Sequence, residues 1–191
     1  MPGTSSTRRR PLLVAAAACV VLLLVVAFGV RQFVAAPFRV PSGSMEPTLR
    51  SGDVILADRT GSAAVHRGEL VVFDGSGYFP KDGAISRYWV KRVVAVGGDS
   101  IRCCDDGGHL VLNGERLEEP YLAPGTDTST VRFDLEVPEG RMFVLGDNRA
   151  DSTDSRFLLG SPGGGMIPTD RVIGEASRIV WPLGRAGRLD R

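Results

Sequence analysis

The stretch YWVKRVVAV, residues 88–96, is rich in aromatic and β-branched side chains and predicts a β-strand. It carries Lys91, one of the two lysines in the 191-residue chain. The alternation of a strand puts Trp89 and two further apolar side chains on the face of Lys91. Two interpretations remain open on this pattern. Burial lowers the pKa of a lysine and makes it a general base, whereas a lysine at a strand edge reaches solvent with its ammonium group. The neighbouring Arg92 indicates that this strand tolerates an outward cation.

Short β-rich segments bounded by turn residues fill most of the chain, and long amphipathic helical patterns are scarce. We therefore expect a mainly-β fold of antiparallel strands. Asn113-Gly114 predicts a two-residue hairpin turn. Gly75–Gly83 and Ser161–Gly165 are predicted to be exposed loops. The other strands are expected at Asp53–Ala57, Glu69–Phe73, Leu110–Leu112, Val131–Val137, Met142–Leu145 and Val172–Val180.

An unbroken apolar run of 19 residues, Leu12–Val30, is close to the length that spans a bilayer as a helix. The alternative is a cleavable secretory signal, whose apolar region is about 7–15 residues long and ends in a small-x-small site. The nearest such site, residues 34–36, precedes Pro37, and proline is a poor residue after a scissile bond. We expect an uncleaved anchor. Arg8–Arg10 favour a cytoplasmic N-terminus, although two arginines beyond the run reduce the asymmetry.

The chain is long enough for one compact domain outside the membrane. We expect the membrane to be the cell membrane and the chain to cross it once. Its formal net charge is +1 and its basic residues form no cluster after the N-terminal tail, which argues against nucleic-acid binding. The expected parts are a cytoplasmic tail at 1–11, an anchor and exit segment at 12–36, an extracytoplasmic domain at 37–184 with an elaboration at about 103–137, and a C-terminal tail at 185–191.

Three cysteines and two histidines bear on redox and metal chemistry. Cys19 lies inside the apolar run and is interpreted as a small apolar residue. Cys103 and Cys104 are adjacent, so a mutual disulfide is geometrically awkward. Free thiols, a strained vicinal pair and links to another chain all remain open. His66 and His109 lie in polar, turn-like contexts that favour solvated loop positions, so we expect no zinc site, no other metal and no cofactor.

A candidate nucleophile lies in the segment PSGSMEPTL, residues 41–49. Gly43 permits a close backbone approach, and prolines stiffen both ends of the loop. A serine in such a loop can stabilise an oxyanion with its own backbone N–H and a neighbouring donor, here the hydroxyl of Ser42. Ser44 is therefore a candidate nucleophile, although Ser-Gly-Ser is also ordinary loop material.

The segment GDNRADSTDSR, residues 146–156, is dense in side-chain oxygens and follows a predicted strand. The spacing of these residues argues against a calcium loop. Counted from Asp147, the third, glycine and terminal glutamate positions of an EF-hand are occupied by Arg149, Ser152 and Leu158. A hydrogen-bonded turn fits better. Asp154 and Arg156 are positioned to pair across it, and Ser152 to hold a lysine amine.

Together these segments resemble type I signal peptidases, the membrane-anchored enzymes that remove signal peptides from exported proteins. The resemblance covers most of residues 37–182 and contains the family motifs in order. These are Pro-Ser-Gly-Ser-Met-x-Pro-Thr-Leu (41–49), Gly-Asp (52–53), Arg-Gly-Glu (67–69), Lys-Arg-Val (91–93), Gly-Gly-Asp (97–99), Gly-Asp-Asn-Arg (146–149) and the segment from Gly174 to Trp181-Pro182.

The resemblance implies a signal-peptidase-type β-domain with its active site near the membrane and a Ser/Lys dyad. Ser44 would be the nucleophile and Lys91 the general base. The Ser44 N–H and the Ser42 hydroxyl would form the oxyanion hole. Ser152 would orient Lys91, with support from Asp154 and Arg156. The pockets for small side chains of an Ala-x-Ala site would be shaped by Phe38, Val40, Met45, Leu49, Trp89 and Val90. The implied partners are signal peptides, the lipid bilayer and, by proximity, the protein-export channel.

Three departures from the family pattern lie outside this dyad: Ala150 in place of a common aspartate, the glycine-rich Ser161–Gly165, and Glu175 in place of a frequent lysine.

One alternative to a signal peptidase is a self-cleaving Ser/Lys domain of the kind in SOS-type repressors. The anchor and the lack of a DNA-binding segment before the domain argue against it. The other alternative is an inactive, membrane-tethered binding module, which the presence of both dyad residues argues against.

Overall fold

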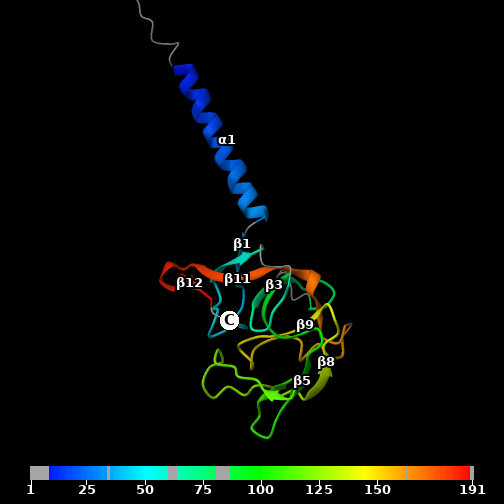
Figure 1. Ribbon diagram of the computed structural model, residues 1–191. Coiled ribbons are helices and arrows are strands. Elements are labelled where there is room, and N and C mark those ends of the chain that lie inside the picture. The colour runs from blue at the N-terminus through cyan, green and yellow to red at the C-terminus, as the bar shows by residue number, and fades with distance from the viewer. Residues whose placement is uncertain (1–8, 34, 60–63, 81–86, 162, 190–191) are drawn as a thin grey trace, which may run out of the picture.

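The computed structural model describes residues 9–33, 35–59, 64–80, 87–161 and 163–189. The N-terminal part is one helix, α1 (Arg9–Phe33), which extends away from the β-strands (Figure 1). Its segment Leu12–Gly29 has a mean hydropathy of 3.0, and none of it is buried against the rest of the chain. At 1.5 Å per residue the helix is about 38 Å long, so its length and composition suffice to cross a bilayer. Residues 1–8 of the expected cytoplasmic tail lie outside the described part.

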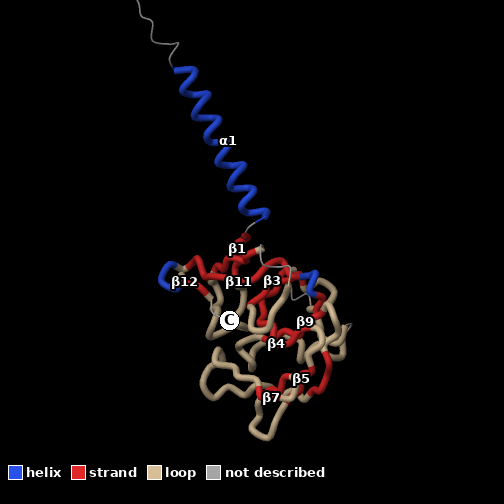
Figure 2. The backbone as a smooth tube through the Cα atoms, in the orientation of Figure 1, coloured by secondary structure: helices blue, strands red, loops and turns tan. Residues whose placement is uncertain are grey.

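The rest of the chain is built on two antiparallel sheets, as expected for a mainly-β fold (Figure 2). The larger has eight strands in the order β1-β2-β11-β3-β4-β9-β10, with β12 also paired to β11, and the smaller has four in the order β7-β6-β5-β8. The strands of the larger sheet are β1 (Ala35–Arg39), β2 (Val54–Asp58), β3 (Leu70–Asp74), β4 (Tyr88–Val96), β9 (Arg141–Leu145), β10 (Ile167–Pro168), β11 (Val172–Trp181) and β12 (Gly187–Arg188). Those of the smaller sheet are β5 (Ser100–Cys103), β6 (Leu110–Leu112), β7 (Glu115–Arg116) and β8 (Phe133–Glu136), and two 3-10 helices are η1 (Thr169–Arg171) and η2 (Leu183–Arg185).

The predicted strands are confirmed, with differences of one or two residues at some ends. The hairpin between β6 and β7 is confirmed as well, since Asn113 and Gly114 have φ of 52° and 86°. The predicted loops are less exposed than expected, because Phe79 packs into the core. Residues 81–83 and 162 of those loops lie outside the described part. Within the expected C-terminal tail, β12 pairs with β11.

Strand β4 lies inside the larger sheet, between β3 and β9, and this placement decides the environment of Lys91. A central strand has neighbours on both edges, so its side chains reach solvent only across a sheet face. Lys91 and Arg92 are each 1% exposed. The edge-strand interpretation of Lys91 is therefore wrong, and so is the interpretation of Arg92 as an outward cation. Arg92 is tolerated because a buried carboxylate compensates its charge, as described below.

The elaboration forms the smaller sheet and shares a core with the larger one. Phe133 of β8 packs on Phe143 of β9, with ring centroids 5.2 Å apart. The same apolar cluster includes Ile101 of β5, Leu110 of β6 and Val94 of β4. Because the two sheets bury one common cluster, the elaboration is not a separate domain.

Candidate active site

The loop 41–49 is fastened to the core by two buried side chains and is open between them. Met45 and Leu49 are both 0% exposed and belong to the cluster between β1, β2 and β11. The N–H of Leu49 donates to the carbonyl of Met45 over 2.9 Å. Ser44 immediately precedes the buried Met45 and is only half-buried. The loop therefore presents the Ser44 hydroxyl at the surface from a fixed backbone.

The structure brings Ser44 and Lys91 together, although they are 47 positions apart in the sequence. Lys91 Nζ lies 2.6 Å from Ser44 Oγ. Burial of the amine lowers the pKa of Lys91 to about 8, opposing the nearby carboxylates of Asp154 and Asp147, which favour the ammonium form. A substantial fraction of the amine is therefore neutral near pH 8, and a neutral amine can accept the hydroxyl proton of serine.

The Ser42 hydroxyl is the second hydroxyl at this site. It donates to Ser44 Oγ over 3.4 Å, at the long end of hydrogen-bond distances. Ser42 is exposed, so its hydroxyl can rotate toward another acceptor beside Ser44 Oγ.

Two residues of the segment 146–156 that the sequence did not single out hold the Ser44 loop in place. The Asn148 N–H donates to the carbonyl of Ser44, and its side-chain amide donates to the carbonyl of Gly43, each over 3.1 Å. The Asp147 carboxylate accepts from the Thr48 hydroxyl over 2.5 Å. It also accepts two bonds from the Arg92 guanidinium, over 2.9 and 2.7 Å. Asp147 thus joins the loop of the serine to the strand of the lysine.

The predicted pair of Asp154 and Arg156 is confirmed. The two side chains are 0% and 1% exposed, and an oxygen of Asp154 accepts from Arg156 over 2.8 Å. Asp154 also accepts the N–H of Gly146 over 3.1 Å. The pair therefore braces the start of the segment that carries Asn148.

Ser152 is placed beside the dyad without bonding to it. Its hydroxyl is buried, and among the described residues it has no hydrogen-bond partner. It lies directly against Gly146, where a Cβ would meet both Ser152 and the carbonyl of Ser44. The hydroxyl is thus an unused donor and acceptor close to the backbone of the Ser44 loop.

A small pocket of about 80 Å³ lies between β1, β2 and β4, and its walls include Val90, the neighbour of Lys91 in the chain. Its walls include four of the predicted pocket residues and five further ones: Phe38, Val40, Trp89 and Val90, with Arg39, Pro41, Ile55, Val72 and Tyr88. Met45 and Leu49 are not in its walls. They pack beneath it, in the same apolar cluster as Val40.

Neither histidine takes part in this site. His66 Nδ1 lies 2.9 Å from a carboxylate oxygen of Glu69, and His109 Nδ1 lies 3.3 Å from Asp105. Each ring is thus occupied by a local carboxylate. In the described part of the chain, no group of three or more His, Cys, Asp or Glu side chains could hold a metal ion.

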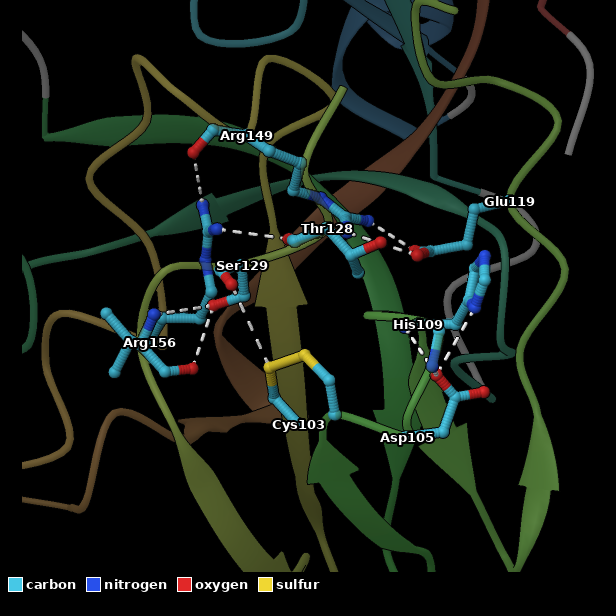
Figure 3. Close-up of a disulfide and its surroundings, with 11 residues drawn as sticks. Cys103, Asp105, His109, Glu119, Thr128, Ser129, Arg149 and Arg156 are labelled. Carbon is cyan, nitrogen blue, oxygen red and sulfur yellow. Dashed lines mark hydrogen bonds and ion pairs between the residues drawn. A yellow bond between two sulfur atoms is a disulfide. The ribbon is translucent and has the colours of Figure 1, made fainter. Parts of the chain in front are cut away.

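Cys103 and Cys104 form a vicinal disulfide with an S–S distance of 1.95 Å (Figure 3). The sequence left free thiols, a vicinal pair and links to another chain open for these two cysteines, and the structure has the vicinal pair. Cys103 Sγ lies 4.0 Å from the carbonyl oxygen of Ser129. A disulfide sulfur carries no proton, so this is a packing contact.

Comparison with known proteins identifies the relatives of this chain. The family described as signal peptidase, peptidase S26, matches residues 13–181. A probable signal peptidase I of Mycobacterium leprae is 34% identical over 210 residues, which cover 81% of this chain and 71% of the relative. Signal peptidase I U of Bacillus subtilis is 35% identical over 166 residues, covering 82% and 81%. A crystal structure of a signal peptidase I from Enterococcus faecalis aligns with 59% of this chain and 96% of its own, at 25% identity and a TM-score of 0.44, too low to bear on the fold.

Proposed function

Because this chain belongs to the signal peptidase family, peptidase S26, and is a serine protease of that family, we propose that Ser44 and Lys91 form the dyad that cleaves signal peptides from exported preproteins. The observation that carries this assignment is the 2.6 Å distance between Lys91 Nζ and Ser44 Oγ, with Lys91 only 1% exposed. A serine needs a base within hydrogen-bond reach, and the histidines are engaged elsewhere.

In the proposed reaction, Ser44 Oγ attacks the carbonyl carbon of the scissile bond while its proton passes to Lys91 Nζ. The C–N bond then breaks, and the Lys91 ammonium returns that proton to the leaving amine. Water attacks the resulting ester of Ser44, with Lys91 again as the base, and releases the signal peptide. The lowered pKa of Lys91 supports this cycle because the amine must be neutral before each attack.

The oxyanion of each tetrahedral intermediate would be held by the Ser44 N–H and the Ser42 hydroxyl. Asn148 fixes the carbonyls of Gly43 and Ser44, so the N–H between them has a defined direction. Donors that are already oriented stabilise developing charge without reorganising. Ser152 would help to orient the Lys91 amine, since its buried hydroxyl has no other partner among the described residues.

The volume of the pocket favours small side chains. Its volume of about 80 Å³ leaves space for only a few water-sized groups. This small volume supports the proposal that cleavage follows small-x-small sequences such as Ala-x-Ala. Met45 and Leu49 would contribute from below, by holding Val40 in the wall.

We propose that α1 anchors the enzyme, with its N-terminus in the cytoplasm and the β-domain on the outer side of the cell membrane. Strand β1 begins at Ala35, close behind the end of α1 at Phe33. So short a connection keeps the domain beside the bilayer, where signal peptides leave the export channel.

The test is cleavage of a secretory preprotein with an Ala-x-Ala site by the purified full-length protein in detergent micelles. Wild type and His66→Gln should release the mature protein, whereas Ser44→Ala and Lys91→Ala should not. Undiminished cleavage by Lys91→Ala would disprove the dyad. Cleavage of the enzyme's own chain without cleavage of the preprotein would favour a self-cleaving domain, and inactivity of the wild type would favour a binding module.

A further inference from the structure

The elaboration contains one segment, Glu119–Ser129, that contacts residues next to the proposed dyad. This segment meets two buried arginines, Arg92 and Arg149, that belong to the two sides of the proposed site. Arg92 follows Lys91 on β4, and Arg149 follows Asn148 in the turn that holds the Ser44 loop. The contacts on each arginine come from different residues of the segment.

Tyr121 covers Arg92. The guanidinium carbon of Arg92 lies 3.9 Å from the centre of the Tyr121 ring, a close cation–π stack. The guanidinium also donates hydrogen bonds to Asp147 and to the carbonyl of Gly68, through N–H groups that lie in its own plane. These hydrogen bonds fix the orientation of the Arg92 guanidinium within its own plane, and the Tyr121 ring blocks its movement out of that plane.

Glu119 and Thr128 hold Arg149 (Figure 3). The two side chains of the Glu119–Arg149 ion pair are 5% and 1% exposed. Arg149 also donates to the carbonyl of Thr128 over 3.1 Å and to the carbonyl of Gly146 over 3.0 Å. Arg156 donates to the same Thr128 carbonyl over 3.3 Å. The segment thus bonds to both arginines of the turn 146–156.

The two contacts form one unit because the Tyr121 hydroxyl donates to Glu119 over 2.8 Å. Burial raises the pKa of Tyr121, with the Glu119 charge adding to the effect, so the hydroxyl keeps its proton and remains a donor. Tyr121 also lines a cavity of about 630 Å³ together with Arg92 and Thr48. Arg92 is only 1% exposed although it lines this cavity, and the Tyr121 ring lies over its guanidinium.

From these contacts we propose that Tyr121 and Glu119 are positioning residues of the peptidase reaction. They hold Arg92 and Arg149 so that Asp147 and Gly146 keep the Ser44 loop in register with Lys91. This inference rests on the proposed dyad. Neither residue lines the pocket of about 80 Å³, so we expect both to act on the geometry of the reacting groups rather than on the small side chains of the substrate.

The first test compares Tyr121→Leu with Tyr121→Phe in steady-state cleavage of a preprotein. Rates are expressed per active site, counted by stoichiometric acylation of Ser44 with a serine-reactive inhibitor, so that misfolded enzyme does not contribute. Tyr121→Leu removes the stack and should lower kcat by about tenfold or more with KM nearly unchanged, because small displacements of reacting groups cost rate. Tyr121→Phe keeps the stack and should recover most of that loss. Tyr78→Leu, which removes a ring 5.7 Å from the guanidinium carbon of Arg171, is the matched control and should keep the wild-type kcat.

The pH at which kcat/KM falls on the acid side of its pH profile, here called the acid limb, is a second measurement. A purely structural role of Tyr121 and Glu119 would leave this pH unchanged. The strongest charges acting on Lys91 are those of Asp154, Asp147, Arg156 and Asp151. When Tyr121→Leu frees Arg92, the Asp147 carboxylate is less neutralised, so the pKa of Lys91 and the acid limb should rise. Glu119→Gln leaves Arg149 without its counter-charge and should shift the acid limb the opposite way, to lower pH. Glu118→Gln alters a neighbouring carboxylate that is 79% exposed and should shift nothing.

The outcomes separate this inference from the dyad itself. If wild-type cleavage depends on Ser44 and Lys91 while Tyr121→Leu keeps the wild-type kcat per active site, the positioning role is overturned and the dyad stands. If Lys91→Ala cleaves like the wild type, the dyad fails first. A fall in the number of active sites, with kcat and acid limb unchanged in both Tyr121→Leu and Glu119→Gln, would assign the segment to folding alone and also overturn the inference.

Discussion

At the scale of single residues, we expect the buried amine of Lys91 to set the pH range in which the enzyme works. Its pKa is lowered to about 8 by burial, so protonation below that pH removes the base. We expect log(kcat/KM) for preprotein cleavage to fall with a slope near one as the pH drops below about 8, and to level off above it. A profile that stays flat from pH 6 to pH 9, measured with fully folded enzyme, would contradict a lysine base.

The same burial makes Lys91 costly to the folded state at neutral pH. Between about pH 8 and the ordinary lysine value of 10.5 the unfolded chain binds a proton that the folded chain does not, so stability rises with pH across this window. Below about pH 8 both states are protonated, and the full cost remains. Lys91→Met should therefore raise the free energy of unfolding by about 3 kcal/mol at pH 7, and by much less at pH 10. Thermal unfolding of both proteins at the two pH values measures this, and a gain independent of pH would count against it.

The residues of the dyad could be named from the sequence, but the groups that hold them could not. The pattern around Lys91 was compatible with a buried or an edge position, and only the family motifs favoured its pairing with Ser44. Arg92 was misjudged because alternation along a strand says which side chains share a face, not what covers that face. Its partner Asp147 is 55 positions away, and Tyr121 comes from an elaboration that matches no family motif quoted above.

At the scale of elements, the turn that opens at Gly146 depends on the absence of a side chain there. A Cβ at Gly146 would lie 2.5 Å from the carbonyl oxygen of Ser44 and equally close to the Cβ of Ser152. Because the carbonyl oxygen of Ser44 is a backbone atom, Gly146→Ala must displace the Ser44 loop. We expect kcat to fall by about a hundredfold while most of the protein still folds. Gly160→Ala is the matched control, since nothing lies within 4 Å of its added Cβ. Equal activity of the two variants in preprotein cleavage would show that the turn is not held this tightly.

Strands with several apolar residues were predictable, whereas β1, β10 and β12 were not. β3 is buried along its whole length and reads as a continuous apolar run. β1 contains Pro37, which usually argues against a strand, yet the edge of a sheet tolerates a missing N–H. β10 and β12 have two residues each, too few for any periodicity to appear. Their pairing is decided by neighbours far along the chain, such as β11 for β12.

At the scale of the whole molecule, the candidate site lies where three parts of the chain meet. The Ser44 loop follows the sheet edge next to α1, Lys91 comes from the centre of the larger sheet, and the elaboration braces the turn between them. The chain between the end of α1 and Ser44 is short, and Ala35–Arg39 within it pair with β2. If α1 spans the bilayer, as we propose, the position of its end limits how far Ser44 and Lys91 can lie from the bilayer.

This arrangement predicts that anchoring and catalysis can be separated by changes in α1 alone. Leu23 and Val26 lie in the apolar segment of the helix, which makes no buried contact with the domain. Replacing both with arginine costs about 2.5–3.5 kcal/mol per residue at the centre of a membrane helix. The double variant Leu23→Arg/Val26→Arg should be released from membranes by alkaline carbonate, while its cleavage of a preprotein in detergent stays at the wild-type level. Leu23→Val/Val26→Leu is the matched control and should remain in the membrane. If the arginine variant also stays there, α1 is not the anchor, and if it loses activity in detergent, the helix contributes to the site.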